Sequence, residues 1–90
     1  MRAIERAARF KADYSREMRT DASLKELLRP VLECLVNDGP LPEKCRDHGL
    51  GGKWKGFRGC HIKPDLVLIY TKYDGVLALA RLGSHAELFG

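Results

Sequence analysis

The sequence has no long hydrophobic run, few aromatic residues and only three cysteines, none of them in a CxxC pair. Because a transmembrane helix needs about 18 or more consecutive apolar residues, no such helix is predicted. The N-terminal residues MRAIERAARFK are charged throughout and lack the apolar core of a signal peptide. We therefore expect a cytoplasmic protein without a membrane partner.

The cysteines Cys34, Cys45 and Cys60 are odd in number and carry no sign of export, so we expect reduced thiols. Cys34 lies in an apolar helical stretch and is predicted to belong to the core. Cys60 precedes His61, which leaves a catalytic thiol as an alternative. Adjacent residues of a strand point to opposite faces, which argues against that alternative.

The 90 residues suffice for one domain, which we expect to span residues 1–90. A hydrophobic content of 44% with 31% charged residues is typical of a globular chain. The net charge of +4 lies in residues 46–63, because the remainder of the chain is neutral. This basic segment predicts a polyanionic partner, either nucleic acid or an acidic protein, and the alternative is a solubilising surface. Its cations are Arg46, Lys53, Lys55, Arg58 and Lys63.

The first half of the chain is predicted to be helical. Phe10, Tyr14 and Met18 recur every four residues, which indicates one amphipathic helix. Ser23 and Glu26 have the spacing of a capping box and precede a second apolar stripe, which NDGPLP (37–42) ends. The short loop between the two helices predicts an antiparallel hairpin.

The second half is predicted to form strands over residues 54–62, 66–72 and 76–82. Asp74 and Gly75 are typical of a type I′ turn between the last two strands. A further strand near Arg2–Arg6 could extend one edge. The predicted fold class is α+β, a two-helix hairpin packed on one face of a small antiparallel sheet.

Several polar residues of the strand half suit the cleavage of RNA without a metal. That reaction needs a base for the 2′-OH, an acid for the departing 5′ oxygen and a cation for the phosphate. Histidine titrates near neutral pH, and the guanidinium of arginine binds two phosphate oxygens at once. A basic strand with aromatic residues, such as the one around Trp54 and Phe57, suits an RNA backbone and its bases. The candidates for the chemistry are His48, His61, Asp65, Arg81 and His85.

Each of these residues also has a structural interpretation. A single histidine is often a surface or capping residue, and Asp65 after Pro64 is a good turn residue. Trp54 and Phe57 could belong to the core. A zinc site made by the three histidines and Asp65 is a further alternative, although the spacings match no standard zinc pattern.

Two segments, RDHGLGGKWKGFRGCHIKPDLVLIY (46–70) and LARLGSHAELFG (79–90), closely resemble the YafQ-type branch of the RelE/ParE toxins of bacterial toxin–antitoxin modules. The two preceding helices agree in layout with that family but are less specific in sequence. The resemblance implies a compact fold like that of the microbial ribonucleases. It also implies a toxin that cuts mRNA in the ribosomal A site without a metal or other cofactor. The implied partners are the ribosome, mRNA and an adjacently encoded antitoxin, DinJ-like or other, through which the complex represses its operon.

Carried over by motif, the residues implied as the acid–base set are His48, His61, Asp65 and His85. Among them His85 is the stronger proton-transfer candidate, and Asp65 orients it or acts as base. Arg81 is implied as the phosphate-stabilising cation and Phe89 as an aromatic that positions the substrate. The predicted RNA- or ribosome-binding residues are Arg46, Lys53, Trp54, Lys55, Arg58 and Lys63.

One departure from the family pattern follows the PD motif. Members of the family can carry tryptophan there, whereas this chain has Leu66, a change expected to bear on base stacking or codon preference. Gyrase poisons of the same superfamily lack the histidine set, which favours a ribonuclease here. The remaining alternatives are a gyrase inhibitor, a binding module that acts through residues 46–63, and an inactive toxin retained for antitoxin binding.

Overall fold

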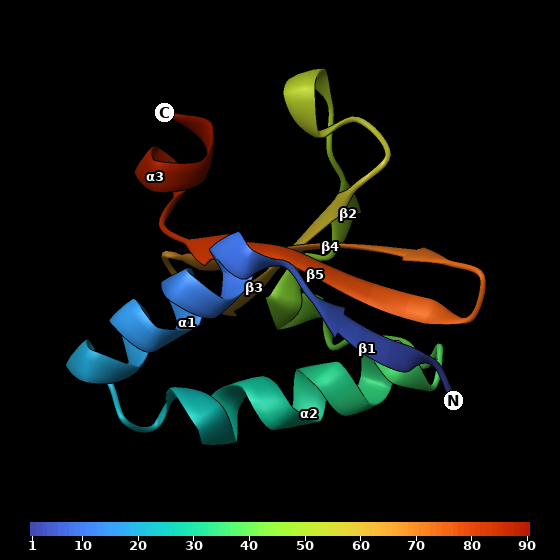
Figure 1. The fold of residues 1–90 in the computed structure, drawn as a ribbon, viewed down its shortest axis with the longest axis horizontal. Helices are drawn as coiled ribbons and strands as arrows, with labels where there is room; N and C mark the ends of the chain where they lie inside the picture. The colour runs from blue at the N-terminus through green and yellow to red at the C-terminus, as the bar shows by residue number, and fades with distance from the viewer.

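The computed structural model describes residues 1–90 and contains a five-stranded sheet with the order β1-β5-β4-β3-β2 (Figure 1). β3, β4 and β5 form the predicted antiparallel meander, and β1 occupies the expected edge position beside β5. β1 runs parallel to β5, so the sheet is not purely antiparallel. A parallel pair needs a long crossover connection, which the intervening helices and strands supply. The strands are β1 (Ala3–Arg6), β2 (His48–Gly49), β3 (Arg58–Lys63), β4 (Leu66–Tyr73) and β5 (Val76–Gly83).

The Asp74-Gly75 turn joins β4 to β5 as predicted, with positive φ angles of 43° and 74° at the two residues. Both central positions of a type I′ turn require positive φ, which glycine and aspartate tolerate best. The strand expected from residue 54 begins at Arg58 instead. A 3₁₀ turn, η2 (Gly52–Trp54), and Gly56 with φ 91° occupy the preceding residues and prevent an extended backbone there.

The predicted helix pair is present as α1 (Ala8–Thr20) and α2 (Leu24–Val36). The capping box expected at Ser23 is wrong. Ser23 has helical backbone angles, and its hydroxyl donates to the carboxylate of Asp21 rather than accepting a helix amide. A neighbouring aspartate is the stronger acceptor, and it draws the serine away from the helix end.

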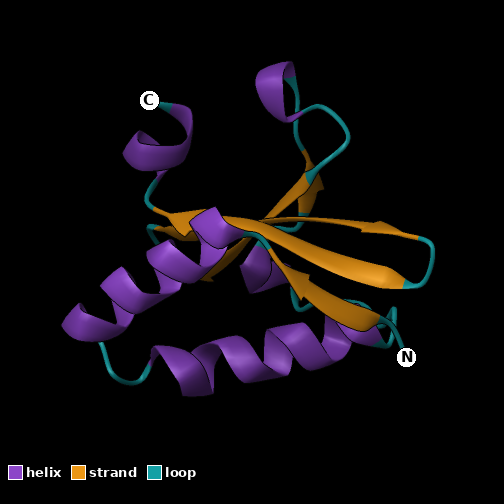
Figure 2. Cartoon of the chain, in the orientation of Figure 1, coloured by secondary structure: helices purple, strands orange, loops and turns teal.

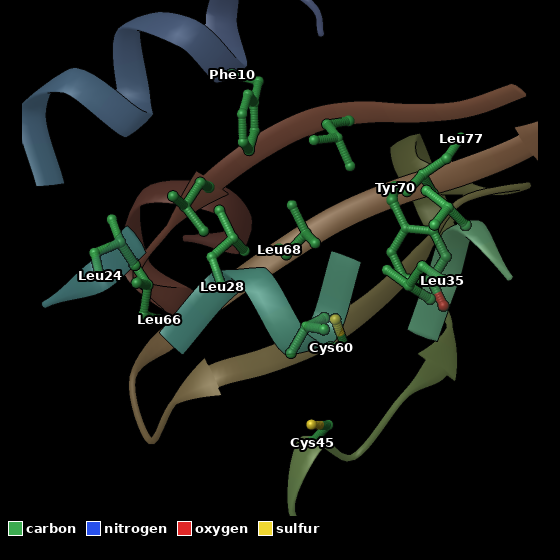
Figure 3. Close-up of a cluster of buried hydrophobic side chains, with 14 residues drawn as sticks. Phe10, Leu24, Leu28, Leu35, Cys45, Cys60, Leu66, Leu68, Tyr70 and Leu77 are labelled. Carbon is green, nitrogen blue, oxygen red and sulfur yellow. The ribbon is translucent and has the colours of Figure 1, made fainter. Parts of the chain in front are cut away.

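The sheet separates two apolar clusters. The helix pair α1 and α2 lies on one side of the sheet and the C-terminal helix on the other (Figures 1 and 2). α1 and α2 cover one face and bury the larger cluster, in which Phe10 and Leu28 meet strand residues such as Leu68 and Tyr70 (Figure 3). On the other face, Val67 and Ile69 pack with Leu88 of the short C-terminal helix α3 (His85–Phe89). Neither α3 nor β2 was predicted. Each helix is too short or too polar to span a bilayer.

Candidate active site

The turn between β3 and β4 and the start of α3 meet at one end of the sheet. His61 of β3 lies opposite Val67 of β4, and Val67 lies opposite Gly83 at the end of β5. α3 begins two residues after Gly83, and Asp65 lies in the turn that follows β3. This register brings together residues that are 24 positions apart in the sequence.

The imidazole of His85 lies between a carboxylate and a second imidazole. Its Nδ1 is 2.8 Å from Oδ1 of Asp65, and its backbone N–H donates to the same oxygen at 3.2 Å. Its Nε2 is 3.3 Å from Nε2 of His61. A hydrogen bond between two ring nitrogens needs a proton on one ring and a free lone pair on the other. The pair therefore contains one proton donor and one proton acceptor in direct contact.

The tautomer of His61 follows from its burial. Its Nδ1 is the one buried side-chain nitrogen or oxygen without a hydrogen-bond partner. A proton on that atom would be buried without an acceptor, which is costly. The neutral ring is thus favoured with its proton on Nε2, from which it donates toward His85.

Asp65 and His85 are open to solvent, with side chains 73% and 51% exposed. The hydrogen bonds from the His85 side chain and backbone lower the pKa of the Asp65 carboxyl below its usual value. Asp65 therefore remains ionised at neutral pH and accepts from Nδ1 of His85. This arrangement orients the His85 ring with its Nε2 edge toward His61.

α3 presents His85 in its first turn because Ser84 begins the helix with a capping box. The Ser84 hydroxyl accepts from the Glu87 backbone N–H at 3.2 Å, and the Glu87 carboxylate accepts from the Ser84 N–H at 3.0 Å. Phe89, also exposed, has its ring centre 6.0 Å from that of His85. The exposed edge of the site therefore contains an imidazole and an aromatic ring from the same helix.

Arg81 lies in a separate buried network. Its Nε and Nη2 donate to the Asp13 carboxylate at 2.7 and 3.3 Å, and its side chain is 16% exposed. Its Nη1 has no hydrogen-bond partner in the protein, yet it is not a buried atom, so this nitrogen reaches the surface. The one-residue register shift beside Ile69 precedes Arg81 along β5, and such bulges re-aim side chains.

His48 is not hydrogen-bonded to the other two histidines. It belongs to β2, opposite Gly59, and its Nδ1 is 2.7 Å from the backbone oxygen of Arg46. Gly59 and His61 are two residues apart and therefore share a face of the sheet. His48 lies beside this face and makes no side-chain hydrogen bond to His61, Asp65 or His85.

The predicted RNA-binding residues divide into two groups. Arg58 donates to Asp47, which also accepts from the buried Tyr70 hydroxyl, and Lys63 donates to Asp21 at 2.9 Å. Both cations are therefore already paired with a carboxylate of the same chain. The second group, Arg46, Lys53 and Lys55, is exposed and has no acidic partner.

Trp54 packs within the protein, which is the core interpretation that the sequence left open. Its ring meets Phe57 edge to face at 5.4 Å, and its indole N–H donates to the Leu88 carbonyl at 3.4 Å. Trp54 thus holds the end of α3. Leu66, at the position that departs from the family pattern, is buried in the larger cluster and offers no exposed stacking surface.

The cysteines are all free. Cys60 is fully buried, and burial raises the pKa of its thiol to about 12, which opposes the thiolate that a nucleophile needs. Cys34, predicted to lie in the core, is half-buried. No three histidine, cysteine or acidic side chains lie together in an arrangement that could hold a metal ion.

Sequence reasoning missed Asp13, Arg16 and Glu87. Asp13 follows Phe10 by three residues and precedes Tyr14, so helical spacing alone would have put it on the apolar face of α1. Glu87 follows Ser84 by three residues, which is capping-box spacing. The partner of Asp13, 68 residues away, had no local signal.

The chain matches bacterial toxins over nearly its whole length. The model of a family described as "Bacterial toxin of type II toxin-antitoxin system, YafQ" matches residues 2–90. The mRNA interferase toxin YafQ of Escherichia coli K12 is 37% identical, over 97% of this chain and 99% of that protein. A chain in the crystal structure of the E. coli DinJ–YafQ complex is 36% identical, with a TM-score of 0.88 and 100% of both chains covered. A metal-bound toxin from Helicobacter pylori is 43% identical, with a TM-score of 0.91 over 99% of this chain and 100% of that chain.

Proposed function

The chain belongs to the YafQ family of toxins from bacterial type II toxin–antitoxin systems, and from this premise we propose that it is an endoribonuclease that cuts mRNA in the ribosomal A site. The observation that carries the proposal is the hydrogen-bonded series of Asp65, His85 and His61. Cleavage by the 2′-OH needs one group that takes a proton and one that returns it. Two imidazoles in contact, one of them oriented by a carboxylate, supply both.

His85 transfers the principal proton in this proposal, because it is the exposed member of the pair. Asp65 holds its ring in one orientation and stabilises the imidazolium that forms. His61, half-buried behind it, exchanges a proton with Nε2 of His85. His48 acts at the margin of the site, where its place in β2 puts it beside the same face of the sheet.

Arg81 binds the phosphate through its free Nη1, while Asp13 holds the other edge of the guanidinium. A fixed cation offsets the charge that grows on phosphorus as it becomes five-coordinate. The reaction so described needs no metal, because the protein's own side chains supply the base, the acid and the cation.

The ribosome and its mRNA are the proposed substrates, and the exposed cations Arg46, Lys53 and Lys55 would bind the backbone of the RNA. Arg58 and Lys63, each paired with an aspartate, and Trp54, packed against Phe57, support this surface. Phe89 offers a ring on which a base can stack. The related chain in the DinJ–YafQ complex supports a cognate antitoxin as the second partner. We further propose that the toxin acts in the cytoplasm and reaches operator DNA only through that antitoxin.

The test is primer extension on a reporter mRNA in a reconstituted translation system, with wild type and His85→Ala compared. We expect ribosome-dependent cuts in wild type and a loss of roughly 100-fold or more in the variant, the usual contribution of a general acid or base. Arg29→Ala, a change in the exposed Arg29–Glu26 pair of α2, is the control and should cleave like wild type.

The same assay separates the rival functions. No cuts with unaffected translation would contradict the ribonuclease, and DNA damage on induction would then indicate a gyrase inhibitor. Cuts that persist undiminished in His85→Ala would remove His85 from the chemistry. The toxin alone can be treated with a chelator, freed of it and added to untreated ribosomes. Loss of cleavage by this toxin, restored by one metal added back to the toxin, would overturn the metal-independent mechanism.

A further inference from the structure

Asp13 is the only charged side chain that the fold buries, at 3% exposure. A buried charge lowers stability unless ion pairs and hydrogen bonds compensate for it. Burial by itself would raise the pKa of Asp13, but hydrogen bonds from Arg81, Leu82 N–H and Arg16 outweigh it and leave the pKa below its usual value. The carboxylate is therefore retained in its charged form on an otherwise apolar face of α1.

The bonds of Asp13 fix the orientation of Arg81. The carboxylate accepts from Nε and Nη2 of Arg81, and its Oδ2 also accepts from the Leu82 backbone N–H at 3.0 Å. β1 pairs with β5 only as far as Leu79, so Asp13 satisfies an amide on the part of β5 that β1 leaves open. Two bonds to one edge of the guanidinium prevent its rotation and leave Nη1 directed away from Asp13.

A second set of bonds leads from Asp13 to α3. Arg16 donates from Nη1 to Asp13 at 3.0 Å and from Nη2 to the Leu82 carbonyl at 3.2 Å. The same Nη2 is 3.2 Å from Oε2 of Glu87. Glu87 in turn caps the helix that carries His85. The guanidinium of Arg16 thus connects α1 to both β5 and α3.

We propose that Asp13 is a positioning residue, which orients Arg81 toward the substrate phosphate and, through Arg16 and Glu87, sets the position of α3 and His85. The inference rests on the proposed ribonuclease function. One buried carboxylate, that of Asp13, then positions both the phosphate-binding Arg81 and the helix α3 that carries His85. Its removal acts on the rate of the chemical step more than on binding, because Asp13 itself is too buried to touch RNA.

The first experiment measures kcat and KM for cleavage on programmed ribosomes with Asp13→Asn, which keeps the shape and removes the charge. The side-chain NH₂ of asparagine is a hydrogen-bond donor, so it would face a donor N–H of the Arg81 guanidinium and one hydrogen bond would be lost. We expect kcat to fall at least tenfold and KM to change less than threefold. A kcat for Asp13→Asn within twofold of the wild-type kcat would overturn the proposal.

A double-mutant cycle separates positioning from a loss of fold. If Asp13 acts in part through Arg81, Asp13→Asn should lower kcat much less in an Arg81→Ala background than it does alone, and only the severalfold loss that passes through Arg16 and α3 should remain. Equal and additive losses in both backgrounds would overturn the proposal. Wild-type cleavage is read in the same assay, so its absence would instead refute the ribonuclease function itself.

Arg16→Gln tests the connection to α3 while Asp13 keeps its carboxylate and both of its bonds to Arg81. The Arg16 side chain is partly exposed, so this variant is expected to fold even where Asp13→Asn does not. We expect a severalfold loss of kcat with little change in melting temperature. Arg29→Gln breaks an exposed ion pair of the same spacing and is the matched control. Equal kcat for the two variants would overturn the connection between Asp13 and α3.

Discussion

His85 makes contacts of different kinds through its two ring nitrogens. Nδ1 faces the carboxylate of Asp65, and Nε2 faces the ring of His61. The first contact favours a proton on Nδ1, and the second leaves Nε2 to exchange a proton with a neighbour of the same chemical type. Histidine is the side chain whose ordinary charge change falls near neutral pH, which suits it to such an exchange.

At the residue scale, the lowered pKa of Asp65 gives a direct test of this geometry. We expect its carboxyl to titrate below the ordinary value of about 3.9 in a ¹³C NMR titration. In His85→Ala the side-chain hydrogen bond is lost and the backbone one remains, so the pKa should rise only part of the way back. Because the folded pKa is the lower one, the stabilisation is present above the unfolded pKa and is lost as pH falls through the folded pKa.

Asp21 is the internal control in the same titration. Hydrogen bonds from Ser23 and Lys63 lower its pKa to about 2, and His85 takes no part in them. The substitution His85→Ala should therefore leave Asp21 unchanged. An Asp65 titration identical in wild type and variant would mean that the two side chains do not pair in solution.

At the scale of elements, α3 depends on its surroundings. A helix of five residues is not stable alone in water. Leu88 is buried against the sheet, Trp54 bonds the Leu88 carbonyl, and Ser84 caps the first turn. The Ser84 cap consequently stabilises the start of the helix that carries His85, and the long-range bond from Trp54 stabilises its end.

The capping box predicts a difference between two serines. Ser84→Ala should destabilise the start of α3 by about 1 kcal/mol, because a helix amide loses its acceptor. The Leu88 amide, which donates to the Ser84 carbonyl, should then exchange its hydrogen faster, and cleavage should fall severalfold. Ser23→Ala is the matched control, since the Ser23 hydroxyl bonds Asp21 and no helix amide. Unchanged Leu88 protection in Ser84→Ala would argue against the cap.

At the scale of the whole molecule, stability depends on the cluster between the helix pair and the sheet (Figure 3). β4 is central, and residues 66–70 are buried on both of its faces. Leu68→Ala should lower the free energy of unfolding by about 2–5 kcal/mol, as expected for a cavity in a close-packed core. Leu27→Ala, at a side chain 41% exposed, should cost less than about 1 kcal/mol.

Urea denaturation measures both variants. The midpoint of Leu68→Ala should fall well below that of Leu27→Ala at a similar slope. Cleavage below the melting temperature should remain in both, because neither residue belongs to the proposed site. Equal midpoints would show that the cluster does not govern unfolding.

Local patterns in the sequence determined much of the fold. The four-residue repeat predicted α1, the Asp74-Gly75 pair predicted the β4–β5 turn, and the apolar run after Asp65 predicted the central strand. Each of these signals lies within a few residues, where backbone sterics and the burial of one face decide the structure. The motifs that resemble the family also indicated His61, Asp65 and His85 as candidate site residues.

The tertiary structure alone decided which of those residues meet. The contact of His61 with His85 requires the register of three strands, and the pairing of Asp13 with Arg81 joins residues 68 positions apart. The serine that caps a helix with its side chain is Ser84 and not Ser23, since the nearby Asp21 competes for Ser23. Spacing in a sequence records which face a residue shares with its near neighbours, whereas long-range partners are set by how the packed elements close on one another.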